Sequence, residues 1–234
     1  EMDTLLFQSD SYATLSFLHT AQRCLERGFT SIRVNGMGPS DFGIVDVKNV
    51  IDRGLFPGAR MKVGCHMLGG TGMPGDMSMY ACTNPVVSDH LQLSFIGSGP
   101  DFFRDQVRRE VKYGGDFIKV FISGSFLSPD GGPEICYLSD DELEMIIKTA
   151  HELGRPVTSH VYPCHMMQKL IGFGIDGMEH GALMDEETAE MFEKNNTYLV
   201  PTFAPFQDMI EENEEFIAQN TEDAQRKLRK YAPI

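Results

Sequence analysis

The chain has 234 residues, of which 41% are hydrophobic and 23% charged, and its formal net charge is −14 because 34 acidic side chains outnumber 20 basic ones. This composition is typical of a soluble globular domain, and the length is sufficient for one sizeable core. The negative charge would repel phosphate groups, which argues against a nucleic-acid-binding or anionic-membrane-binding surface. We therefore expect a small-molecule substrate as the partner, and homo-oligomerisation stays open.

The five cysteines are widely scattered and odd in number, and they contain no C-x-x-C pair. Neither a disulfide framework nor a cysteine zinc site is indicated, so a reducing compartment is expected. No stretch approaches the roughly 18 apolar residues of a membrane span, and residues 1–30 lack a signal-peptide pattern. These features predict a cytoplasmic protein.

Six helical patterns follow one another along the chain, and each is followed by a glycine or asparagine turn and then by a strand-like run. The helices are predicted near 12–27, 41–53, 101–113, 140–153, 164–173 and 186–194. The strands are predicted near 29–34, 61–65, 116–122, 156–160, 175–179 and 197–202. Alternating helices and apolar strands indicate the α/β class, with a parallel sheet covered by helices.

The clearest unit covers residues 139–160. Ser139 with Glu142 three positions later forms a capping box at the start of a helix, and apolar residues at helical spacing form one face of it. Gly154 ends the helix, and the strand after it ends at His160.

Two connections, 66–100 and 123–138, are too long to be simple turns. Long loops in compact domains are usually functional or disordered, so these are predicted to be active-site loops, with a flexible insertion as the alternative. The segment 207–230 is predicted to be one amphipathic helix without a functional role.

Lys119, His160 and His180 each lie in or at the end of a predicted strand. Because side chains at the carboxyl ends of barrel strands converge, these three residues indicate a metal site. An unpaired lysine is disfavoured in an apolar strand, and the alternative is that Lys119 pairs with a carboxylate across the barrel. His66, at the start of a long loop, could face a substrate or lie on the surface.

Several motifs together resemble the metal-dependent amidohydrolase superfamily, and within it the branch of imidazolonepropionase-like and prolidase-like enzymes. They are GFTSIRV, RGLFPGARMKVGC, TGMPGD, GGDFIKVFISG, LSPDG, LSDDELEMIIKTAHELGRPVTSHVY, GIDGMEHG and NTYLVPT. The resemblance runs in order from about residue 15 to about residue 205.

The resemblance implies a (β/α)8 TIM barrel that hydrolyses amide or related C–N bonds with one or two divalent metal ions, Zn²⁺ by default. Lys119 matches the strand-four lysine that is carboxylated by CO2 and bridges two metals, and His160 and His180 match the metal-binding histidines of strands five and six. Tyr162 matches a tyrosine that helps hold the substrate's carboxylate in prolidase-like members. Packing over the barrel rim is the alternative for Tyr162.

The chain also departs from the family pattern. The H-x-H pair of strand one and the aspartate of strand eight are absent, so residues 1–234 are expected to form a partial barrel domain without these strands and without the flanking small β domain. The family often has Arg-Asp where this chain has Arg33-Val34, and a histidine where it has Pro74. The expected substrate is therefore no more specific than a dipeptide-like compound, an N-acyl amino acid or a cyclic amide.

Two alternatives to a hydrolase remain. One is a catalytically inactive barrel that binds a ligand or partner, which predicts that the missing ligands are absent even from the complete gene. The other is phosphate binding by the GGTG and GSGP stretches, which lack the spacing of a phosphate loop.

Overall fold

A computed structural model describes residues 9–36, 42–73, 76, 94–126, 132–204, 207 and 214–231. Its first half contains α2 (Asp10–Glu26), β1 (Ser31–Asn35), α3 (Gly43–Asp52), β2 (Arg60–Gly64), β3 (Met67–Gly70), β4 (Ser94–Gly97), α5 (Pro100–Lys112) and β5 (Ile118–Phe121). Then follow α6 (Asp140–Glu152), β6 (Val157–Pro163), α7 (Cys164–Gly172), β7 (Gly177–Leu183), α8 (Glu186–Asn195), β8 (Tyr198–Val200), α10 (Glu214–Ala218) and α11 (Glu222–Tyr231). The α/β class is confirmed.

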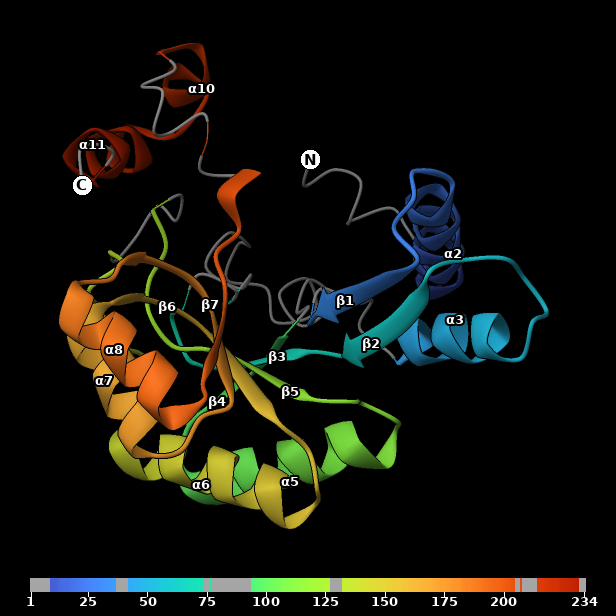
Figure 1. The fold of residues 1–234 in the computed structure, drawn as a ribbon, viewed down its shortest axis with the longest axis horizontal. Coiled ribbons are helices and arrows are strands. Elements are labelled where there is room, and N and C mark those ends of the chain that lie inside the picture. The colour runs from blue at the N-terminus through green and yellow to red at the C-terminus, as the bar shows by residue number, and fades with distance from the viewer. Residues whose placement is uncertain are drawn as a thin grey trace.

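The strands are parallel and form an arc (Figure 1). Six of them pair in the order β4-β3-β5-β6-β7-β8, and β1 pairs with β2. The two groups meet where the amide of Asp116, just before β5, donates to the carbonyl of Val63 in β2 at 2.7 Å. The arc curves strongly enough for Arg33 of β1 to reach Glu179 of β7, which is the curvature of a partial barrel.

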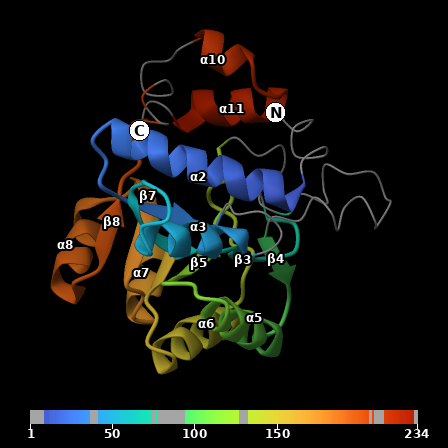
Figure 2. The ribbon, with the colours of Figure 1, turned by 90° about the vertical axis from the view of Figure 1, so that its right-hand side faces the viewer.

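Two apolar cores hold the helices to the strands. The larger core joins the six-stranded sheet to α5, α6, α7 and α8, and includes Phe103, Ile118 and Met178. The smaller core joins α2 and α3 to β1 and β2, and includes Ala21 and Ile44. Figure 2 shows α10 and α11 at the opposite end of the molecule from α5 and α6. The strands therefore lie between helices α5 and α6 on one side and this C-terminal pair of helices on the other.

The predicted capping box of α6 is present. The amide of Ser139 donates to Glu142 Oε2 at 2.8 Å, and the Ser139 side chain accepts from the backbone of Glu142 in return. Glu142 Oε1 also accepts from the amide of Gly99, directly before α5. One carboxylate therefore fixes the start of two neighbouring helices.

The prediction that 66–100 is a single long loop is wrong, because it contains β3 and β4. The glycines of β3 concealed the strand, since glycine-rich stretches usually indicate turns. Glycine is needed there for close packing: a Cβ on Gly70 would lie 1.9 Å from the carbonyl oxygen of Tyr137. The segment around Pro74 lies outside the described residues.

The prediction of one helix over 207–230 is also wrong in its described part. α10 ends at Ala218 and α11 begins at Glu222. Thr221 interrupts the helix because its hydroxyl accepts a hydrogen bond from the amide of Ala224 at 3.3 Å, as a residue before a new helix does. Among the helices that the structure describes, none is long and apolar enough to cross a lipid bilayer.

Candidate metal centre

Lys119, His160 and His180 lie on three adjacent parallel strands, β5, β6 and β7. His160 pairs in register with Phe121 of β5, and His180 pairs with Val161 of β6. The centroids of the two imidazole rings are 4.5 Å apart. The charge of Lys119 is close enough to lower the pKa of both histidines. The structure therefore brings the three residues together, and their role as metal ligands stays a prediction.

Both histidines are electrically neutral near pH 7. Burial, His180 and Lys119 hold the pKa of His160 well below its usual value. Burial, followed by Lys119, lowers the pKa of His180 to about 4. Metal ions bind the neutral imidazole ring rather than the protonated imidazolium, so the fold holds both rings in the state that a metal requires.

The backbone at His180 is strained. Its φ of 75° lies in the left-handed region, and so does the φ of 50° at Thr202, just after β8. The two residues are joined by a hydrogen bond of 2.6 Å between His180 Nδ1 and Thr202 Oγ1. Non-glycine residues rarely adopt this conformation and are concentrated at functional sites. This bond fixes the orientation of the His180 ring.

Lys119 pairs with the carboxylate of Glu179, which was the alternative that the sequence left open. Both side chains are buried, and burial lowers the pKa of Lys119 while Glu179 raises it. Glu179 also accepts from Thr158 Oγ1 at 2.7 Å and from Arg33 at 3.3 Å. Glu179 is not among the residues that the sequence predicts for the site, although a glutamate within the apolar stretch before His180 was a detectable signal.

Tyr162, predicted to contact substrate, lies beside both histidines. Its ring centroid is 4.7 Å from that of His160 and 5.2 Å from that of His180. On its other side it packs against Phe126 and the C-terminal helices, including Tyr231. Burial raises the pKa of the Tyr162 phenol. The packing alternative is thus present, and the substrate-binding role stays a prediction.

His66 does not join this cluster through any contact of the described residues. It is fully buried, so the surface-loop alternative is wrong. Its Nδ1 lies 2.7 Å from Glu110 Oε1, and its ring stacks on Phe95 with centroids 4.3 Å apart. His66 therefore packs between the strands and α5, and its predicted contact with substrate has no support from this geometry.

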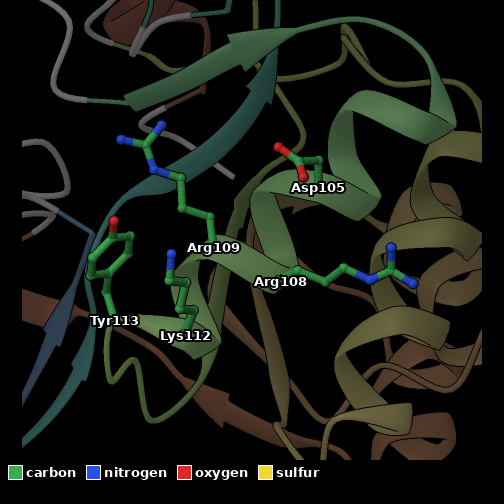
Figure 3. A pocket seen from close by; sticks show the side chains of 5 residues that line it. All are labelled: Asp105, Arg108, Arg109, Lys112 and Tyr113. Carbon is green, nitrogen blue, oxygen red and sulfur yellow. The ribbon is translucent and has the colours of Figure 1, made fainter.

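A separate surface pocket lies along α5, lined by Asp105, Arg108, Arg109, Lys112 and Tyr113. Figure 3 shows Arg109, Lys112 and Tyr113 on one side of the helix, with Arg108 pointing the other way. None of the predicted site residues lines this pocket.

The ligand atoms of this cluster fit a divalent metal ion only if Lys119 is one of the ligands. Within the part of the chain that the structure describes, no three His, Cys, Asp or Glu side chains gather as a metal group. His160 and His180 supply two neutral nitrogen donors, and a carboxylated Lys119 would add oxygen. Such a set accepts zinc and also manganese, iron, cobalt or nickel.

Comparison with known proteins supports the family resemblance. No family model matches the chain. Ochratoxinase of Aspergillus niger is 25% identical over 214 residues, which are 84% of this chain and 42% of the relative. A solved amidohydrolase is 26% identical to this chain, with a TM-score of 0.82. The match covers 97% of this chain and 55% of that structure.

A solved prolidase with bound N-methylphosphonate-L-proline is 24% identical, with a TM-score of 0.81, and the match covers 98% of this chain and 55% of that structure. The chain thus spans about half the length of the proteins it matches. The proteins that this chain resembles in fold and sequence are thus an amidohydrolase, a prolidase and ochratoxinase, which confirms the predicted similarity to the amidohydrolase superfamily.

Proposed function

We propose that the chain is the central part of a metal-dependent hydrolase that cleaves an amide or other C–N bond in a small substrate. The observation that carries this proposal is the convergence of Lys119, His160 and His180 on three adjacent parallel strands. In α/β barrels, catalytic groups come from several strands and gather toward their carboxyl ends.

Each side chain has a distinct task in this reaction. The low pKa values of His160 and His180 keep both imidazoles available as nitrogen ligands. Lys119 would contribute as a CO2-derived carbamate, with one or two divalent ions, Zn²⁺ first. When bound, the metal supplies a Lewis acid that polarises the scissile carbonyl group and activates water.

Tyr162 is the residue best placed to contact the substrate. Its ring borders both histidines, so its position would suit one side of a substrate bound at the metal. We propose that it orients a carboxylate of the substrate, as the family resemblance implies. Dipeptide-like compounds, N-acyl amino acids and cyclic amides are the classes to test.

The test uses the full-length protein, because the chain covers only part of its relatives. The protein is purified without chelator, its metal content is determined by elemental analysis, and release of amine is measured on a panel of the three substrate classes. Hydrolysis that requires metal, and that Lys119→Ala and His160→Asn both abolish, is expected.

His165→Asn is the matched control, because His165 is exposed on α7 only five positions from His160. This variant should keep normal activity and metal content. A full-length protein that binds no divalent metal and hydrolyses no member of the panel would refute the proposal and favour a catalytically inactive barrel.

A further inference from the structure

The carboxylate of Glu179 is held by donors from three other strands. It lies in β7 and is buried, directly before His180. Its Oε1 accepts from Thr158 of β6 and from Arg33 of β1, and its Oε2 accepts from Lys119 of β5. Because Oε1 is fixed by two donors, the direction in which Oε2 faces is fixed as well.

This arrangement determines where the amino group of Lys119 lies. A lysine side chain has four rotatable bonds, and a buried ammonium group goes where a counter-ion is. The pair with Glu179 holds the charge of Lys119 near both His160 and His180. Without Glu179, nothing else among the described residues is paired with this ammonium group.

We propose that Glu179 is a positioning residue of the metal site: it holds the amino group of Lys119 near the two histidines in the metal-free protein and is retained by Arg33 and Thr158 once Lys119 becomes an anionic ligand. The inference rests on the proposed function, since it requires that a metal binds here.

Carboxylation of Lys119 explains why Glu179 needs partners other than Lys119. Carboxylation forms a bond between Nζ and the carbon of CO2, breaks one carbon–oxygen π bond whose electron pair moves to oxygen, and releases two protons from the ammonium group to water. Lys119 then carries a negative charge and no longer attracts Glu179. An uncompensated buried carboxylate would be costly, so it requires another cation.

Arg33 meets this requirement because it is itself held in place. Its guanidinium group lies 4.3 Å from the centroid of the Phe117 ring and donates to the Tyr198 hydroxyl at 3.0 Å. The contact with Glu179 joins β1 to β7 across the arc. Arg33 is therefore a fixed partner for Glu179 in both states of the site.

The experiment compares Co²⁺ binding by the full-length wild type, Glu179→Gln, Glu179→Asp and Thr158→Val, after metal removal and in bicarbonate buffer. Visible absorption reports the cobalt ligand set, and titration gives the affinity. Replacing groups that orient metal ligands typically weakens metal affinity about 10–100-fold. We expect a loss in this range and an altered cobalt spectrum for Glu179→Gln, partial rescue by Glu179→Asp, and a smaller loss for Thr158→Val.

Glu187→Gln on the exposed face of α8 is the control for removing one negative charge, and it should bind Co²⁺ as the wild type does. Thr158→Val retains Glu179 and covers the case in which Glu179→Gln does not fold. The positioning role would be overturned, and the proposed function left intact, if Glu179→Gln bound Co²⁺ as tightly as the wild type or more tightly, with an unchanged spectrum. If Glu179→Gln is unfolded, the same result in Thr158→Val would overturn it. A wild type that binds no metal would overturn both.

Discussion

Replacing Glu110 with alanine is expected to destabilise the fold strongly. Glu110 lies on α5 with no solvent exposure, and its carboxylate accepts from three donors: the amide of Cys65 at 3.0 Å, the amide of His66 at 3.2 Å and His66 Nδ1 at 2.7 Å. This carboxylate therefore fixes the backbone between β2 and β3 to the helix that covers it.

The magnitude follows from the donors that the substitution leaves unpaired. Each buried donor without a partner costs about 1–3 kcal/mol, and such costs are not fully additive, so Glu110→Ala should lower the free energy of unfolding by about 3–5 kcal/mol. Glu110→Gln keeps an acceptor for the two amides, and its NH2 group can donate to His66 Nδ1. The Nε2 atom of His66, which has no hydrogen-bond partner among the described residues, would then carry an unpaired proton, so a loss of about 1–2 kcal/mol is expected.

Urea unfolding followed by circular dichroism measures both values. Asp105→Ala is the control, because Asp105 is exposed on the same helix and should change the free energy of unfolding by less than about 0.5 kcal/mol. The reasoning would be refuted by a Glu110→Ala protein whose stability lies within about 1 kcal/mol of the wild type, since the three hydrogen bonds would then contribute almost nothing.

Three further predictions concern the site and the strand beside it. Because the folded pKa of His180 is about 4 and the unfolded value is near 6.5, the stability of metal-free protein should fall as the pH is lowered from 7 to 4, by about 2–3 kcal/mol from this residue. His180→Asn, which tolerates the positive φ, should remove that part of the pH dependence in urea unfolding, and an unchanged pH profile would contradict it. Gly70→Ala should lower the free energy of unfolding by several kcal/mol because its Cβ would meet a backbone oxygen. Gly172→Ala is the control, because no described atom lies within 4 Å of its Cβ, and it should change the melting temperature little. Equal melting temperatures of the two variants would contradict the packing argument. Residues 1–234 alone should retain less than one metal ion per chain after dialysis, because a catalytic ion normally has three protein ligands and one of the three candidates, Lys119, binds only after carboxylation; elemental analysis that finds two tightly bound ions would show that ligands have been missed.

The amino-acid sequence by itself determined the α/β class, the ends of most helices and the strands that carry the candidate ligands. These features depend on local signals: apolar spacing, the capping box at Ser139 and the glycine or asparagine after each helix. Placing Lys119, His160 and His180 near one another required only the rule that parallel strands end on the same side of a sheet. Recognition of the family added the expected metal chemistry.

The tertiary structure alone decided which groups pair inside the barrel. Glu179 lies 60 positions from Lys119 and 146 from Arg33 in the sequence, so no local pattern predicts that their side chains meet. The burial of His66 likewise depends on Glu110, 44 positions away. Strand β3 was concealed because Gly70 allows a close approach of the distant Tyr137 rather than a turn. Side-chain pairing in a barrel depends on strand register and curvature, which exist only after the chain has folded.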